Sequence, residues 1–256
     1  VGWGAHEQLA GVLQQRTRAV SETHELVELY ARLGQVYEEA LGRVDDAIVA
    51  YRRIFDGLDK THEQAIAALA RLYTIKGAPR QLLEVYEREL ENAISDVAEA
   101  EILAKLGRLS SDQLGDIPRA VELWKRVLDL RGEDPEGLSA LASLYERTQK
   151  WPELCDVLER LADTSSDEVE RAGHLARRAQ IFTDKLGRDD LALDEWQRVL
   201  DIDLENVIAL RAIADIRRRQ NDAAEMVLAL QNLVERAGKQ LERAELKAVY
   251  RELGKT

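Results

Sequence analysis

Apolar residues recur three and four positions apart along the whole chain, and no stretch shows the alternation that is typical of a strand. This spacing places the apolar side chains on one side of a helix and the charged ones on the other. It predicts an all-α protein of about fourteen helices joined by short turns. The expected helices cover residues 5–20, 23–41, 44–57, 61–76, 78–93, 96–114, 116–130, 134–149, 151–163, 167–186, 188–202, 204–220, 222–236 and 239–254.

Polar residues mark the starts of several of these helices. Thr61, Asp96, Ser165 and Asp222 each stand three positions before Gln or Glu. This is the spacing of a capping box, in which side chain and backbone satisfy each other's free groups. Pro135 stands just inside another start, where its missing N–H costs nothing. These residues predict where five of the helices begin.

A Leu-Gly segment recurs with a nearly constant step. Leu41-Gly42, Leu114-Gly115 and Leu186-Gly187 are 73 and then 72 residues apart. Each is followed by an alanine and, four positions later, by an aromatic residue: Ala47 with Tyr51, Ala120 with Trp124, and Ala192 with Trp196. A second series keeps the same step elsewhere: Leu9, Leu82, Leu154 and Met226. Two series with one period indicate an internal repeat of about 72 residues, built from two helix pairs.

These residues resemble the tetratricopeptide repeat family, in the long-array form common in large bacterial proteins. The family combines leucine with a small residue in the first helix of a pair, and a small residue with an aromatic in the second. The first-helix elements here are Leu33-Gly34, Leu69-Ala70, Leu106-Gly107 and Leu141-Ala142, and the second-helix elements are the alanine–aromatic pairs. The small residue lets neighbouring helices approach, and the aromatic fills the groove. The resemblance implies a right-handed α-solenoid of stacked antiparallel helix pairs, continuous over residues 1–256.

The sequence departs from the family pattern in three ways. The turn around Leu41-Gly42 and its two equivalents is one residue longer. Leu82, Leu154 and Met226 stand where the family usually has alanine, and the usual proline between repeats is mostly absent. These departures concern the geometry between repeats and not the fold class.

In this family the first helix of each pair lines a concave face that binds partner peptides or helices. The resemblance therefore implies a protein–protein interaction scaffold and not an enzyme. The inward positions carried over to this sequence are Arg32, Gln35, Arg71, Lys105, Arg108, Arg177, Gln180, Arg211 and Arg218. This set, called the basic stripe below, would favour protein partners with acidic segments, because Arg and Lys pair directionally with carboxylates.

The basic stripe has a simpler interpretation as a solvated face that neutralises its own charge. Glu28 stands four positions before Arg32, and Glu101 stands four before Lys105. Oppositely charged residues at this spacing pair on the surface of a helix. Both interpretations are open at the level of the sequence.

The two ends of the repeat pattern raise a second function. The chain opens on the second helix of a pair and closes on a first helix, in which Leu246, Val249, Tyr250 and Leu253 keep helical spacing. Each repeat offers an apolar face to its neighbour, so solenoids normally need polar caps. The chain is then either a fragment of a longer array or a structural building block that forms homo-oligomers by end-to-end stacking through these residues.

Catalytic and metal-binding chemistry has little support in the sequence. His6, His24, His62 and His174 are scattered, and no phosphate-binding loop or metal-ligand motif is found. We expect no catalytic residue, no metal and no cofactor. Cys155 is the single cysteine, and its apolar surroundings predict a buried, unreactive thiol.

Charge and hydropathy disfavour two further classes of partner. Nucleic-acid-binding domains carry a clustered basic excess, whereas this chain has a formal net charge of −12. No apolar run has the length of a membrane span, and no basic-then-apolar leader opens the chain. We expect neither nucleic acid nor membrane as a partner and take a cytoplasmic location by default. An accessory domain of a larger enzyme or transport machine remains a third possibility.

Overall fold

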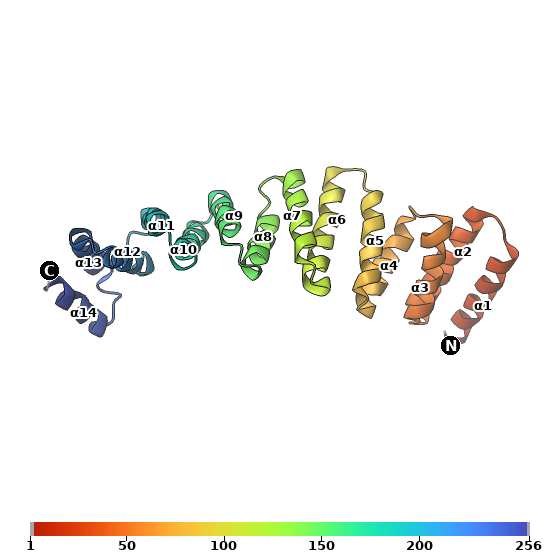
Figure 1. Cartoon of the computed structure of the whole chain (residues 1–256). Coiled ribbons are helices and arrows are strands. Elements are labelled where there is room, and N and C mark those ends of the chain that lie inside the picture. The colour runs from red at the N-terminus through yellow and green to blue at the C-terminus, as the bar shows by residue number, and fades with distance from the viewer. Residues whose placement is uncertain (1–2, 255–256) are drawn as a thin grey trace. The chain divides into compact units, whose positions relative to one another are not determined.

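The computed structural model describes residues 3–254, and every regular element within them is helical (Figure 1). The α-helices are α1 (Trp3–Ala19), α2 (Thr23–Gln35), α3 (Val44–Arg53), α4 (Glu63–Lys76), α5 (Pro79–Glu91), α6 (Asp96–Leu109), α7 (Ile117–Arg131), α8 (Pro135–Arg147), α9 (Trp151–Thr164), α10 (Glu168–Asp184), α11 (Asp189–Ile202), α12 (Val207–Arg219), α13 (Ala223–Ala237) and α14 (Arg243–Leu253). Three π-helical turns continue α2, α3 and α6, namely η1 (Val36–Ala40), η2 (Ile54–Leu58) and η3 (Ser110–Leu114). The predicted all-α architecture of about fourteen helices is confirmed.

The helix starts lie close to their predicted positions, but most of the predicted capping residues are wrong. The Asp222 carboxylate accepts a hydrogen bond from the Glu225 N–H at 3.1 Å, as expected. The predicted caps Thr61, Asp96 and Ser165 are replaced by His62, Ser95 and Asp167, whose side chains accept bonds from the first turns of α4, α6 and α10. Each of these starts offers neighbouring polar residues, and the residue that caps is the one directly before the first helical residue.

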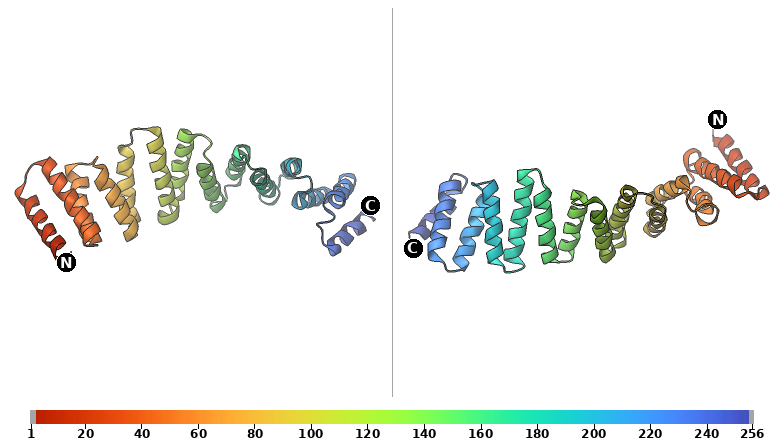
Figure 2. Two further views of the ribbon diagram at one scale, coloured as in Figure 1. Left: turned by 180° about the vertical axis from the view of Figure 1, so that it is seen from behind. Right: turned by 90° about the horizontal axis from the view of Figure 1, so that it is seen from above.

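The helices form two compact units, Val1–Arg131 and Gly132–Thr256. Within each unit, successive helices run antiparallel and each packs against the helices before and after it (Figures 1 and 2). The first unit holds α1 to α7, and the second holds α8 to α14. The helical-hairpin repeat is thus present in both units, and one continuous array over residues 1–256 stays a prediction.

The predicted contact between a small residue and an aromatic ring is present in the structure. A Cβ added to Gly34 would stand 2.7 Å from Cζ of Tyr51, and one added to Gly107 would stand 2.7 Å from Nε1 of Trp124. Tyr51, Trp124 and Trp196 are each only 2% exposed. The aromatic residues of the repeat are therefore core residues, and glycine is required where the ring lies against the helix backbone.

The longer turn has one geometry in all three copies. Gly42, Gly115 and Gly187 have φ of 63°, 68° and 62°, a left-handed conformation that favours glycine. The residue after each glycine donates its N–H to a carbonyl six positions earlier: Arg43 to Tyr37 at 2.7 Å, Asp116 to Ser110 at 2.8 Å, and Arg188 to Phe182 at 2.8 Å. A wide turn thus absorbs the extra residue without disturbing the next helix.

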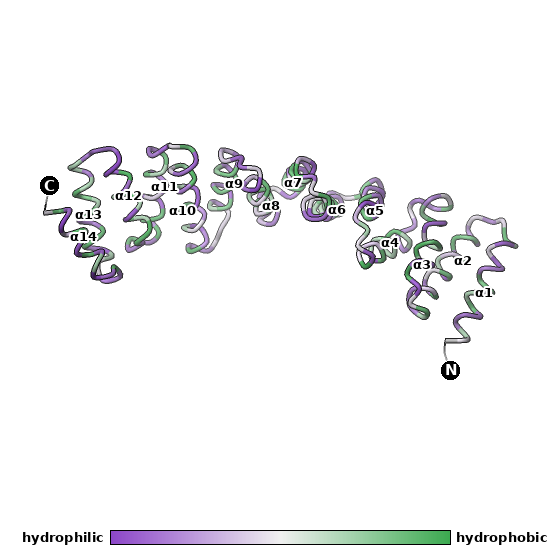
Figure 3. Tube along the Cα trace, turned by 60° about the horizontal axis from the view of Figure 1, so that its bottom comes forward, coloured by the Kyte–Doolittle hydropathy of each residue, from purple (hydrophilic) through white to green (hydrophobic). Residues whose placement is uncertain are grey.

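The core consists of leucine, alanine and aromatic side chains between neighbouring helices. Hydrophobic and hydrophilic segments alternate along the helices, as expected when one side is packed and the other is solvated (Figure 3). Leu69 and Leu103 of the first unit and Leu138 and Leu154 of the second are fully buried. Burial of one such side chain stabilises a protein by about 1.5–3 kcal/mol. The main packing contacts join successive helices, so stability accumulates repeat by repeat.

Candidate functional site

Ion pairs that skip one helix show which helices share a face. In the first unit, Arg71 of α4 pairs with Glu38 of η1 at 2.7 Å. In the second unit, Arg177 of α10 pairs with Glu146 of α8 at 2.6 Å, and Arg218 of α12 pairs with Glu252 of α14 at 2.7 Å. We call the side lined by α2, α4 and α6 in the first unit, and by α8, α10, α12 and α14 in the second, the even-helix face of that unit. The residues of the predicted basic stripe lie on these even-numbered helices, and the ion pairs place Arg71, Arg177 and Arg218 on this face.

Carboxylates of the chain itself neutralise most cations of the basic stripe. Besides Arg71, Arg177 and Arg218, Arg211 pairs with Glu245 of α14. Lys105 pairs with Glu89 of α5 at 3.2 Å. The even-helix face therefore presents balanced charge at these positions and not a free basic surface.

The remaining stripe residues have other contacts. The Arg108 guanidinium lies over the Trp124 ring, 5.8 Å from its centroid. Arg32 donates to Oε1 of Gln35 at 3.1 Å, and the Gln35 amide donates to Glu39 at 3.0 Å. Gln180 is exposed. Within residues 3–254, Arg32 thus bonds to an amide and to no carboxylate.

The pairs expected within single helices are replaced by other contacts. Oε1 of Glu28 lies 3.7 Å from Nδ1 of His24, and Glu28 forms no ion pair with Arg32 among the described residues. Lys105 reaches across to Glu89 and not to Glu101 of its own helix. The packing of α5 against α6 brings the Glu89 carboxylate within reach of the long Lys105 side chain. The spacing of residues along α6 alone does not reveal such a partner on another helix.

A hollow of about 290 Å³ opens on the even-helix face between α10 and α12. Trp196, Ala212 and Ile216 supply its apolar part, and the predicted residues Gln180 and Arg211 lie together on its wall. Ile208 also lines the hollow and is 59% exposed. The sequence interpretation missed Ile208, because one exposed apolar residue in a helix is common.

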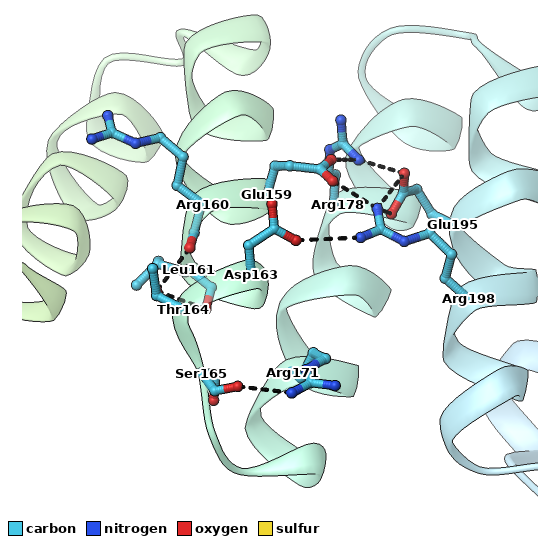
Figure 4. A network of polar contacts seen from close by, with 10 residues as sticks. All are labelled: Glu159, Arg160, Leu161, Asp163, Thr164, Ser165, Arg171, Arg178, Glu195 and Arg198. Carbon is cyan, nitrogen blue, oxygen red and sulfur yellow. Dashed lines mark hydrogen bonds and ion pairs between the residues drawn. The ribbon is translucent and has the colours of Figure 1, made fainter. Parts of the chain in front are cut away.

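A network of charged residues joins α9, α10 and α11 (Figure 4). Arg178 pairs with both Glu159 and Glu195, and Arg198 pairs with the same two carboxylates at 2.8 and 3.0 Å. The Glu195 side chain is only 8% exposed. Burial raises the pKa of Glu195, while the charges of Arg178 and Arg198 act in the opposite direction.

The sequence interpretation also missed this network, although the repeat contains a signal for it. One repeat earlier, the positions of Arg178 and Glu195 hold Leu106 and Leu123, which are 1% and 7% exposed. A charged residue at two apolar positions of the repeat could have indicated a buried ion pair. The network is structural in its immediate effect, because it joins three helices through their side chains.

The four residues predicted for self-association differ in exposure. Val249 is 7% exposed and belongs to the packed side of α14, whereas Tyr250 is 56% exposed. Leu246 and Leu253 are half-buried. At the other end, Val12 of α1 is 55% exposed, while its equivalents Val85 and Val157 are 0% and 4% exposed. Self-association through these surfaces stays a prediction.

The remaining chemistry of the chain is limited. Among residues 3–254, no group of three or more His, Cys, Asp or Glu side chains could hold a metal ion. No helix in that range is long and apolar enough to cross a membrane. Cys155 is 2% exposed, and burial raises the pKa of its thiol to about 11. The predicted buried thiol is confirmed.

Comparisons with known proteins agree with this architecture. Residues 65–98 and 138–172 match the tetratricopeptide repeat family. None of the curated proteins compared with the sequence matches it. Among solved structures, the complex of Naa15/Naa10 bound to HypK-THB is similar with a TM-score of 0.62 and 15% identity, over 97% of this chain and 36% of that one. At this identity the likeness shows the fold alone.

Two further structures share the repeat with lower similarity. A tetratricopeptide repeat protein from Parabacteroides merdae has a TM-score of 0.44 and 16% identity, over 98% of this chain and 93% of that one. YrrB, described as a TPR protein with an unusual peptide-binding site, has a TM-score of 0.45 and 14% identity, over 75% of this chain and 97% of that one. The fold of this family is generally that of a scaffold for protein interactions. Residues 65–98 and 138–172 thus match tetratricopeptide repeats, and the antiparallel helix pairs of both units have the fold of that family.

Proposed function

We propose that the chain is an interaction scaffold that holds a segment of a partner protein on the even-helix face of its second unit. The hollow between α10 and α12 carries this proposal. Its volume of about 290 Å³ lies just below the range for small-molecule pockets, which is roughly 300–1,000 Å³. It therefore suits one or two side chains of a partner better than a cofactor. Binding, and not catalysis, is the role that this surface supports.

The exposed side chain of Ile208 supports a docking role for the hollow. At 59% exposure it adds apolar surface next to Ala212 and Ile216. Arg211 and Gln180 supply polar groups beside it. An apolar centre with polar groups around it is the arrangement that protein interfaces use to combine affinity with orientation.

The acidic partner predicted from the basic stripe is best tested at Arg32. Arg71, Lys105, Arg177, Arg211 and Arg218 are all paired with carboxylates of the chain, so reversing their charge would also disturb the fold. Arg32 is exposed and bonds to Gln35 only, among residues 3–254. If a partner places an acidic segment on the stripe, Arg32→Glu weakens its binding and the weakening diminishes at high salt.

A photo-crosslinking residue at position 208 tests the docking surface. The matched control carries the same residue in place of Leu228 of α13, which is 52% exposed. A protein captured at position 208 is identified, purified and titrated calorimetrically against Ile208→Glu and Leu228→Glu. We expect Ile208→Glu to weaken binding about tenfold or more, as for a residue at the centre of an interface, and Leu228→Glu to leave it unchanged. Equal affinities of the two variants would reject the surface.

End-to-end association is a second candidate function, favoured by the exposure of α1. Val12 is 55% exposed, although packing covers its equivalents Val85 and Val157. Elsewhere in the repeat, the position of Val12 is covered by the first helix of a helix pair. The helix α14 is such a first helix, and its Tyr250 is exposed. Sedimentation at increasing concentration should then show oligomers that Val12→Glu abolishes and Val49→Glu, at a site 60% exposed, does not. A monomer at all concentrations rejects this candidate.

A further inference from the structure

The repeat allows the hollow to be compared with the same place in the first unit. The positions of Thr183 and Asp215 correspond to those of Glu38 and Arg71. There the Arg71 guanidinium and the Glu38 carboxylate form an ion pair at 2.7 Å that bridges α4 and η1. Thr183 is too short to replace Glu38, and Asp215 carries the opposite charge to Arg71. The bridge is therefore missing between α10 and α12, where the hollow opens.

A second arginine is missing when the hollow is compared with the repeat immediately before it. The position of Gln180 corresponds to that of Arg108, whose guanidinium lies over the Trp124 ring at 5.8 Å. Trp196 corresponds to Trp124, and both rings are 2% exposed. Over the part of the chain that the structure describes, no arginine or lysine lies over Trp196. Each of the two equivalent places thus has an arginine at a position where the hollow has none, and the arginines that do line the hollow are Arg211 and Arg219.

The charges that line the hollow leave one carboxylate uncompensated. Arg211 pairs with Glu245, Arg219 with Asp189 at 2.9 Å, and Asp215 with Arg218. Asp184 also lines the hollow and forms no ion pair with any residue from 3 to 254.

A neighbouring hydroxyl group is unsatisfied as well. Oγ1 of Thr183 is buried and has no hydrogen-bond partner among the described residues. A side chain that enters the hollow therefore meets the free charge of Asp184 beside Trp196 and Ile216, and the buried Thr183 hydroxyl in the same wall has an unused hydrogen-bonding capacity.

We propose that the hollow between α10 and α12 is a subsite for an arginine side chain of the partner segment. This inference rests on the proposed function and names the chemistry of its partner. The guanidinium donates to the Asp184 carboxylate and to the side-chain oxygens of Thr183 or Gln180, and its plane lies against Trp196 as Arg108 lies against Trp124. Lysine fits less well, because an ammonium group lacks both the planar fork and the stacking surface.

The test uses two small probes, N-acetyl-arginine amide and N-acetyl-citrulline amide, on the full chain. Citrulline has nearly the same shape as arginine but no charge. The indole N–H of Trp196 and the side-chain amide of Gln180 report binding in ¹⁵N–¹H spectra. We expect saturable shifts from the arginine probe at millimolar concentration and at least about fivefold weaker binding of the citrulline probe.

Three variants separate the subsite from non-specific attraction to an acidic protein. Asp184→Asn should lower the affinity for the arginine probe about two- to fivefold, as expected for a partly exposed charge pair. Asp194→Asn removes the same charge from an exposed position of α11 outside the hollow and should leave the affinity unchanged. Gln180→Arg restores the counterpart of Arg108 and should abolish binding of the probe.

Several results would overturn the proposal. Equal affinities for the two probes, equal affinities of Asp184→Asn and Asp194→Asn, or no saturable shift of the Trp196 indole each exclude an arginine subsite. Crosslinking at Ile208 does not depend on these probes. A partner that is captured there and weakened by Ile208→Glu, together with failure of the arginine probe, rejects the subsite and retains the scaffold.

Discussion

The buried ion network of α9, α10 and α11 can be tested against an apolar counterpart within the same chain. Arg178 and Glu195 occupy the positions that Leu106 and Leu123 hold one repeat earlier. Both leucines are buried, at 1% and 7% exposure. The double variant Arg178→Leu/Glu195→Leu therefore places into the second unit an arrangement that the first unit already accommodates.

The structure indicates how much each variant should cost. Arg178→Leu leaves Glu195, which is 8% exposed, with Arg198 as its remaining partner at 3.0 Å. Removing one partner of a buried ion pair costs roughly 3–5 kcal/mol, and the surviving Arg198 contact reduces this to about 2–4 kcal/mol. In the double variant no charge is stranded, because Arg198 and Glu159 still pair at 2.8 Å. Its stability should lie within about 1 kcal/mol of the parent chain, or above it.

Thermal unfolding and native-state hydrogen exchange measure these differences. A cost of this size lowers the midpoint of the transition by roughly 5–15 °C in a domain of comparable length. Repeat proteins can unfold unit by unit, so exchange of the amides in α9 to α11 gives the local free energy directly. We expect Arg178→Leu to accelerate this exchange strongly and the double variant to restore it.

An additive outcome would refute the reasoning. If the double variant loses as much stability as the two single variants together, the ion network stabilises this junction by more than leucine packing can replace. The matched control is Arg160→Leu, which removes the exposed pair between Arg160 and Glu133 at 2.9 Å. That variant should change stability by less than about 1 kcal/mol.

Three further predictions follow from buried groups. Because burial raises the folded-state pKa of Glu195, its contribution to stability is present below pH 4.5 and is lost as the pH rises through the folded value. Urea titrations should therefore show that the free energy of unfolding of the parent chain rises relative to that of Glu195→Gln as the pH falls from neutral to about 4. A difference between the two free energies that does not change with pH would contradict the raised pKa of Glu195. The Cys155 thiol, with its pKa raised to about 11, should react with a disulfide reagent at pH 8 about a hundredfold more slowly in the folded chain than in urea; equal rates would show that it is accessible. Gly34→Ala should cost about 1–3 kcal/mol in chemical unfolding, because the new methyl group would stand 2.7 Å from Cζ of Tyr51. The same change in a Tyr51→Leu background should cost much less, and an equal cost there would exclude the steric explanation.

The candidate site was only partly predictable from the sequence. Gln180 and Arg211 were predicted to face inward, and both line the hollow. Thr183 and Asp215 belong to no motif and become informative only when they are compared with Glu38 and Arg71, their equivalents in the first unit. The partners of the basic stripe were also not predictable, because Arg71 and Glu38 meet through the packing of helices that are not adjacent in sequence.

The sequence by itself determined the helices, the repeat of about 72 residues and the aromatic core. These features depend on spacing within one helix or on recurrence along the chain, and the left-handed glycines of the wide turns follow the same period. The tertiary structure decided which carboxylate pairs with which cation, where charge is buried and where a hollow opens. Those outcomes depend on the offset between packed helices and on the length of single side chains. Thr183 and Asp215 stand where the first unit has Glu38 and Arg71, so the hollow opens where the first unit has an ion bridge.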